Sequence, residues 1–106
     1  KRWFEVASIR DIDDEEALQV EANGDLIALF NLGGKYYATA DACPATGSSL
    51  SDGYIEDGVV YCDDDAYSYD IRSGQPRHDP SAVAVKRYPV KIDGRLVYVG
   101  IVVESA

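Results

Sequence analysis

The sequence predicts an all-β domain, a small antiparallel barrel or sandwich built from hairpins. Four turn-forming dipeptides recur along the chain: Asn23-Gly24, Gly33-Gly34, Asp57-Gly58 and Asp93-Gly94. They supply the positive φ angles that two-residue hairpin turns require. The segments between them are short and rich in Val, Ile and Tyr, as strands are. Helical periodicity is almost absent, and only residues 13–20 (DDEEALQV) could form a helical turn.

Each dipeptide separates two predicted strands. In chain order these strands cover residues 17–22, 25–32, 35–40, 53–56, 59–62, 88–92 and 95–103. Trp3, which precedes all of them, is expected to plug one end of the barrel. Residues 76–82 (PRHDPSA) are typical of an irregular loop.

Length and charge limit the classes of function. A chain of 106 residues predicts a single domain over residues 1–106. No apolar run approaches the roughly 20 residues of a membrane span, and the start lacks the apolar region of a signal peptide, so a cytoplasmic location is expected. The net charge of −9 disfavours nucleic acid and membrane surfaces and favours a basic protein partner. The acidic run at residues 11–16 is expected to be a solvated turn.

Two predicted loops begin with a cysteine. The first covers residues 43–53 and the second residues 62–74, so Cys43 and Cys62 stand nineteen positions apart. This spacing alone also suits two unrelated buried thiols. The Gly, Ser, Asp and Pro residues that follow each cysteine favour loops whose backbone amides point toward a sulfur-ligated ion.

Several further segments occur in register with these loops. The first loop continues as residues 49–53 (SLSDG), and the second is followed by residues 67–70 (YSYD) and 73–76 (SGQP). With these motifs the chain resembles the Rieske-type ferredoxins of bacterial aromatic-ring dioxygenase systems, from WFEVAS to LVYVG. The resemblance implies a Rieske-like domain with two protruding cysteine-bearing loops, and a cluster-loop region over about residues 43–76. It also implies electron carriage from a flavin reductase to a terminal oxygenase through a two-iron two-sulfur cluster.

The departures from this family fall on the cluster ligands. Where the family has one histidine after each cysteine, this chain has Ala45 and Asp65. In a Rieske centre two thiolates hold one iron and two imidazoles hold the other. Ala45 has no donor atom, and the carboxylate of Asp65 is a harder ligand than imidazole. We therefore expect that a normal cluster does not form, and the remaining way to complete one would use water, Asp63, Asp64, Thr46 or His78.

His78 is the only histidine of the chain. The resemblance places a proline-bearing loop near it over the cluster, which would bring it toward the site. A lone histidine between Arg77 and Asp79 in a loop is more typical of a solvated surface residue, so we do not count it among the predicted ligands.

Without a cluster, the cysteines have two other uses. Placed side by side, as the resemblance implies, they could close a disulfide worth about 3 kcal/mol, although a cytosolic glutathione pool opposes it. The alternative is a non-standard metal such as zinc, held by Cys43, Cys62 and Asp65 with a water as fourth ligand. The aspartates at residues 63–65 are expected to raise the thiol pKa by repulsion, which disfavours a thiol enzyme. No catalytic residue is predicted.

Two functions follow from these observations. One is an electron carrier of the ferredoxin type, with a two-iron two-sulfur cluster if the family function is retained. The other is a cluster-free binding or structural subunit, as in the small subunit of nitrite reductase, which is an analogy from fold alone. In both cases the chain is a component of an oxidoreductase system more than a catalyst, and its partner is the basic surface of a reductase or oxygenase.

Overall fold

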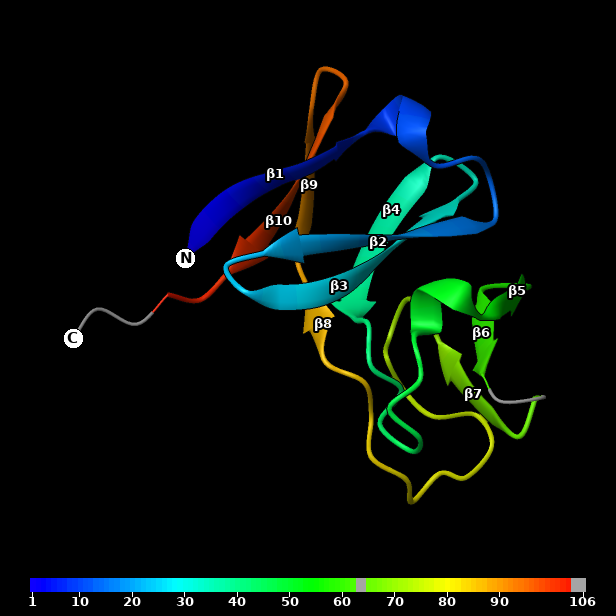
Figure 1. Cartoon of the computed structure of the whole chain (residues 1–106). Helices are drawn as coiled ribbons and strands as arrows, with labels where there is room; N and C mark the ends of the chain where they lie inside the picture. The colour runs from blue at the N-terminus through cyan, green and yellow to red at the C-terminus, as the bar shows by residue number, and fades with distance from the viewer. Residues whose placement is uncertain (63–64, 104–106) are drawn as a thin grey trace.

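Strands make up nearly all of the regular structure in the computed structural model, which describes residues 1–62 and 65–103 (Figure 1). The strands are β1 Arg2–Ser8, β2 Glu16–Ala22, β3 Asp25–Leu32, β4 Lys35–Ala40, β5 Tyr54–Glu56, β6 Val59–Cys62, β7 Tyr67–Asp70, β8 Arg87–Tyr88, β9 Val90–Asp93 and β10 Leu96–Ile101. Two single-turn 3-10 helices, η1 Ile9–Asp11 and η2 Leu50–Asp52, complete the described elements. The predicted all-β class is confirmed. No helix in this part of the chain is long and apolar enough to cross a membrane.

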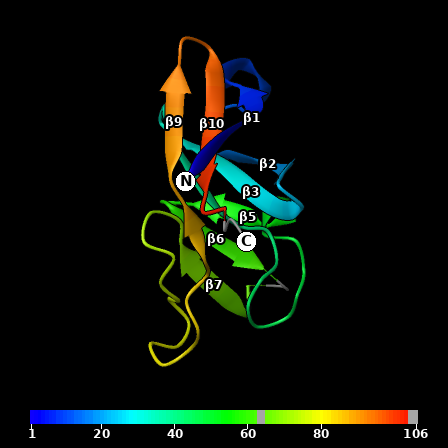
Figure 2. The same cartoon turned by 90° about the vertical axis from the view of Figure 1, so that its left-hand side faces the viewer.

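The strands form three antiparallel sheets. Their orders are β1-β10-β9, β2-β3-β4-β8 and β5-β6-β7. The first two sheets lie together and form what we call the base, while β5-β6-β7 and the loops over residues 41–53 and 71–86 form the loop end (Figures 1 and 2). The molecule is flattened, with extents of 36 × 35 × 18 Å. Both cysteines belong to the loop end.

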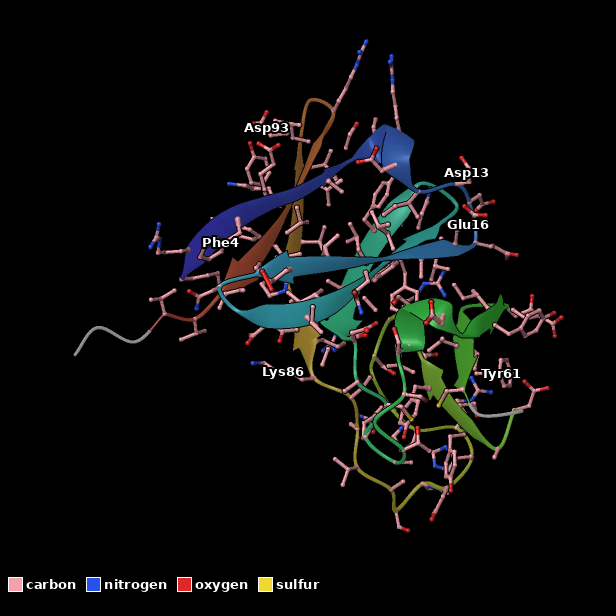
Figure 3. All side chains as sticks on the ribbon, viewed as in Figure 1. Phe4, Asp13, Glu16, Tyr61, Lys86 and Asp93 are labelled. Carbon is pink, nitrogen blue, oxygen red and sulfur yellow. The ribbon has the colours of Figure 1, made fainter. Side chains whose placement is uncertain are left out.

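Three of the four predicted hairpin turns are confirmed at the predicted residues. The fourth is shifted by one position, because Asp93 ends β9 and pairs with Leu96, which leaves Gly94 and Arg95 as the turn residues. Asn23 and Gly24 have φ angles of 53° and 84°, and Asp57 and Gly58 have 51° and 76°. Positive φ at both central residues is what a two-residue hairpin turn with the right twist needs. The acidic run at residues 11–16 extends from the end of η1 to the first residue of β2, and its acidic side chains, Asp13 and Glu16 among them, are exposed (Figure 3).

The predicted strand at residues 17–22 is confirmed as β2, which pairs with β3 along its whole length, so the one segment that could form a helical turn is extended from Glu16 onward. One detail of the predicted elements is wrong. The predicted strand at residues 88–92 is broken by Pro89, which lacks the N–H that a central ladder position requires. Tyr88 therefore ends β8, paired with β4, while Val90 begins β9, paired with β10. This break carries the chain from one sheet of the base to the other.

The prediction for Trp3 is also wrong. Its side chain is 38% exposed, and the ammonium group of Lys91 lies 4.8 Å from its ring centroid. Trp3 pairs with Gly100 across β1 and β10, and the alternation of side chains along a strand directs its neighbour Phe4 to the opposite face. Phe4 is the aromatic residue that packs against the core of the base.

The two buried cores lie on opposite faces of β3. Ile27 and Leu29 belong to the core of the base, whereas Ala28 and Phe30 belong to the core of the loop end. A strand buried on both faces is expected to be apolar along its whole length, as residues 26–30 (LIALF) are. The loop-end core also contains both cysteines, so the candidate site packs against this face of β3.

Candidate functional site at the cysteine loops

The structure brings the two cysteines together. Their Sγ atoms lie 2.8 Å apart, with the Cys62 thiol donating to the sulfur of Cys43. Both residues are buried, with exposures of 2% for Cys43 and 5% for Cys62, and both carry thiols and not a disulfide. Cys62 is the last residue of β6, and Cys43 follows β4 by three positions. The sequence-based expectation that the two sulfurs lie side by side is confirmed.

A closed turn holds Cys43. Its carbonyl accepts hydrogen bonds from the amides of Thr46 and Gly47 at 3.3 and 2.8 Å, and its own amide donates to the carbonyl of Ser48 at 2.8 Å. Gly47 has a φ of 79°, which favours glycine at this position. The turn directs the Thr46 side chain and the amides of Ala45 and Thr46 toward the Cys43 sulfur.

This environment changes the acidity of Cys43 in the opposite direction to the one predicted. Burial raises its pKa, but the hydrogen bonds from Cys62, Thr46 and the backbone of the turn outweigh burial and leave the pKa below its ordinary value. The expectation that neighbouring aspartates raise the thiol pKa is therefore wrong for Cys43. Of those aspartates, Asp63 and Asp64 lie outside the described residues.

Asp41 holds the start of the first cysteine loop in place, and it was not among the residues predicted from the sequence. Its carboxylate is 4% exposed and accepts hydrogen bonds from the Ser49 hydroxyl at 2.6 Å, the Gln19 amide at 2.7 Å and the Ser51 backbone N–H at 2.9 Å. Burial opposes its ionisation, yet these donors outweigh burial and hold the pKa of Asp41 below its ordinary value. The available signal was an acidic residue directly after a buried strand and two positions before a cysteine.

Two aromatic side chains and His78 close the site on the side of β7. The Cys43 thiol donates to the hydroxyl of Tyr69 at 3.9 Å, and burial followed by the hydrogen bond with Cys43 raises the pKa of this phenol. His78 packs edge-on against Tyr67 and Tyr69, with ring centroids 5.1 and 5.4 Å apart. Its Nδ1 atom lies 3.2 Å from the amide nitrogen of Ser68.

His78 is therefore not the solvated surface residue that the sequence favoured. It is half-buried, because the rings of Tyr67 and Tyr69 cover it. Its Nδ1 atom faces the backbone of Ser68. Its ring packs against Tyr69, whose hydroxyl lies 3.9 Å from the Cys43 sulfur.

Asp65 lies at the mouth of the site. It is exposed, has a φ of 66°, and lines a cavity of about 340 Å³ together with Cys62, Asp52, Tyr54 and Tyr61. Tyr61 extends from β6 at this side of the loop end (Figure 3). Within residues 1–62 and 65–103, no three His, Cys, Asp or Glu side chains gather as a metal site. The set of Cys43, Cys62 and Asp65 as metal ligands stays a prediction.

The donor set does not fit the cluster that the resemblance implies. A Rieske centre takes two thiolates and two imidazoles, and an all-cysteine cluster takes four thiolates. This chain has two cysteines and one histidine, and that histidine directs Nδ1 at the backbone of Ser68. Position 45, beside Cys43, carries only the methyl group of alanine. The site can hold a pair of sulfur atoms, but it cannot supply the nitrogen ligands of the second iron.

Comparison with known proteins gives consistent matches over most of the chain. The family model of the Rieske [2Fe-2S] domain matches residues 2–89. The ferredoxin subunit of biphenyl dioxygenase from a Pseudomonas strain is 34% identical over 98 residues, which cover 92% of this chain and 90% of that protein. The ferredoxin subunit of 3-phenylpropionate/cinnamic acid dioxygenase from Escherichia coli is 34% identical over 92 residues, 86% of each chain.

Solved structures share the fold. The ferredoxin of carbazole 1,9a-dioxygenase from Nocardioides aromaticivorans superposes with a TM-score of 0.85 at 22% identity, covering 93% of this chain and 97% of that one. A putative NADH-dependent nitrite reductase small subunit from Mycobacterium tuberculosis gives a TM-score of 0.87 at 22% identity, with 97% of each chain covered. At these identities the likeness shows the fold alone.

Proposed function

Because the chain belongs to the Rieske [2Fe-2S] domain family, we propose that it is a ferredoxin-type component of an oxidoreductase system whose cluster site has lost its nitrogen ligands. The observation that carries the proposal is the donor set: two adjacent sulfur atoms, with Ala45 and Asp65 at the positions of the two imidazoles. The chain keeps the fold and the two thiols, and it has no normal two-iron two-sulfur cluster. It acts as a single Rieske-like domain over residues 1–106, in the cytoplasm.

The proposed partner is the basic surface of a protein, a reductase or an oxygenase. The net charge of −9 supports this choice, and Asp52 and Asp65 place two of the negative charges beside Cys62 at the loop end. Opposite charges steer two proteins together and fix their orientation. A relative of the same fold has been solved as a complex of reduced oxygenase and oxidised ferredoxin in carbazole 1,9a-dioxygenase, with a TM-score of 0.83 at 26% identity to this chain. The same charge disfavours nucleic acid and anionic membranes as partners.

The first experiment measures the metal content of the purified chain. We expect a folded, colourless protein without iron, without acid-labile sulfide and without the electron paramagnetic resonance signal of a reduced cluster. About two irons and two sulfides per chain would overturn the proposal. Preparation under anaerobic conditions with added iron and sulfide controls for loss of a fragile cluster.

The second experiment restores the missing ligands. The double variant Ala45→His with Asp65→His should gain cluster absorption after reconstitution, because the two imidazoles would complete the set with Cys43 and Cys62. The single variants are the matched controls and should remain colourless, since each leaves one ligand position empty. A folded double variant that takes up no cluster would contradict the assignment of positions 45 and 65.

Electron carriage through an intact cluster is the second candidate, and the names of the relatives favour it, since both are ferredoxin subunits of dioxygenases. It requires ligands from outside the set described above, such as water or Asp63. The metal analysis separates the two candidates, because an electron carrier of this kind must contain iron in stoichiometric amount.

A further inference from the structure

We propose that Cys43 and Cys62 form a reversible dithiol/disulfide couple, in which Cys62 reacts first with an external disulfide of neutral or positive charge and Cys43 completes the protein disulfide. The proposal rests on the proposed function in one respect, since a bound cluster would occupy both sulfurs. It assigns to the site a two-electron exchange in place of the one-electron chemistry of an iron–sulfur centre.

The geometry of the sulfur pair carries the proposal. The Sγ atoms are 2.8 Å apart, and a disulfide bond is about 2.05 Å long, so closure requires a movement of less than about 1 Å. The backbone on both sides is held by hydrogen bonds: Cys62 pairs with Tyr67 between β6 and β7, and Cys43 is fixed in the turn that ends at Ser48. The approach of the two sulfurs is therefore built into the folded backbone.

The two cysteines differ in access. Cys62 lines the cavity of about 340 Å³ at the loop end, and Cys43 is not among the residues that line it. Cys43 is 2% exposed, with the hydroxyl of Tyr69 3.9 Å from its sulfur and the side chain of Thr46 bonded to it. An external disulfide entering the cavity therefore meets Cys62 before Cys43.

The charge of the cavity selects the oxidant. Asp52 and Asp65 line it beside Cys62, and the described lining residues carry no basic side chain. Carboxylates that line a cavity raise the local concentration of cations and lower that of anions. A cationic disulfide is thus favoured over an anionic one such as oxidised glutathione.

The chemistry balances in two exchange steps. The Cys62 sulfur attacks one sulfur of the external disulfide; the external S–S bond breaks, a mixed disulfide forms, and the Cys62 proton ends on the leaving thiol. The Cys43 sulfur then attacks the Cys62 sulfur, and the second half of the oxidant leaves as a thiol with the Cys43 proton. Two protein thiols are oxidised and one external disulfide is reduced to two thiols. A dithiol reductant reverses both steps.

The test exposes the reduced full chain to cystamine, a cationic disulfide, under anaerobic conditions and follows the intact mass. The wild type should lose the mass of two hydrogen atoms and both alkylatable thiols, without a lasting adduct. Retention of both thiols, or a stable cysteamine adduct on the wild type, would overturn the proposal. This measurement needs no variant, so it stands even if a substitution impairs folding.

Serine variants test the order of attack. Cys43→Ser should accumulate one stable cysteamine adduct on Cys62, at least about tenfold faster than Cys62→Ser accumulates an adduct on Cys43, because only Cys62 faces the cavity. Equal rates in two folded variants would overturn the assigned roles. Asp52→Asn, with the sulfurs untouched, should reduce the preference for cystamine over oxidised glutathione; an unchanged preference would overturn the role of charge.

Failure of this inference is distinguishable from failure of the proposed function. An iron-free chain whose thiols resist oxidation contradicts the couple and leaves the cluster-free assignment in place. A chain that purifies with stoichiometric iron contradicts both.

Discussion

Asp41 is the residue that ties the first cysteine loop to the base. One carboxylate satisfies donors from β2 and from residues 49 and 51 at once, so a neutral amide in its place would turn a donor toward at least one of them. Asp41→Asn should lower the free energy of unfolding by about 1–3 kcal/mol, the usual cost of an unsatisfied buried polar group. Urea unfolding near neutral pH measures this loss, and the exposed Asp93→Asn is the matched control.

The same residue predicts a pH dependence. The pKa of Asp41 is depressed in the folded state, so its contribution to stability is fully present above the ordinary carboxyl pKa. It is lost as the pH falls through the folded-state pKa. The Asp41→Asn variant should therefore lose less stability than the wild type on acidification, and parallel stability curves for the two proteins would contradict this.

Tyr88 predicts a dependence of opposite sign. Burial, and then its hydrogen bond to Asp25 at 3.1 Å, raise the pKa of Tyr88 to about 12. Because the raised pKa favours the neutral phenol in the folded state, its contribution is fully present below about pH 10, the ordinary tyrosine pKa, and is lost as the pH rises through about 12. In Tyr88→Phe one late-ionising phenol should be missing from the alkaline absorbance titration, and the alkaline decline in stability should be less steep. An unchanged titration would show that Tyr88 is not among the late phenols.

At the scale of single residues, the sequence located the sulfurs but not their supports. Cys43 and Cys62 could be placed together because a family resemblance relates their loops. Asp41 and Tyr69 could not, because their roles depend on contacts with residues far along the chain: Gln19 for Asp41 and Cys43 for Tyr69. Trp3 failed for the same reason, since strand register decides which face of β1 is buried.

Among the elements, Gly53 joins η2 to β5 and lies against backbone that cannot move away. A Cβ atom there would stand 2.5 Å from the carbonyl oxygen of Tyr61 in β6 and 3.1 Å from that of Leu50. Gly53→Ala should cost about 1–3 kcal/mol of stability, because the hairpin must shift to admit a methyl group.

Gly100→Ala is the control for this substitution. There the three nearest atoms belong to side chains: the ring of Pro89 at 2.9 Å, and the exposed Lys1 and Trp3 at 3.0 and 3.2 Å. Gly100→Ala should therefore cost less stability than Gly53→Ala, whose added Cβ meets backbone oxygens. Chemical denaturation of both variants compares them directly. A Gly53→Ala protein as stable as the wild type would show that the β5–β6 hairpin yields more easily than its hydrogen bonds imply.

Local sequence signals were sufficient for the hairpins and insufficient for the short helices. Turns at Asn23-Gly24 and Asp57-Gly58 are fixed by backbone angles that few residues adopt, so their prediction needed no tertiary information. η1 was not predicted from the sequence. A signal for it existed, since Ser8 and Asp11 form a reciprocal capping box around it. The break at Pro89 was visible in the sequence, but which sheet each half joins depends on the assembled base.

For the whole molecule, β3 makes one cooperative unit of two cores. Leu29 faces the base and Phe30 faces the loop end, so β3 cannot lose its partners on one side without uncovering the other. We expect a single unfolding transition. Fluorescence of Trp3, which reports on the base, and alkylation of Cys62, which reports on the loop end, should give the same midpoint in urea. Two separate midpoints would contradict this coupling.

The shared strand also sets how the thiol pair could be transferred to another scaffold. A peptide cut to begin at residue 41 would carry both sulfurs, the tyrosines of β7 and His78. It would leave behind Ala28 and Phe30, which share one core with the cysteines and these tyrosines. A site transferred to another scaffold therefore cannot be a single segment. It needs residues 41–86 and, in addition, a strand of the new scaffold that presents apolar side chains in the positions of Ala28 and Phe30.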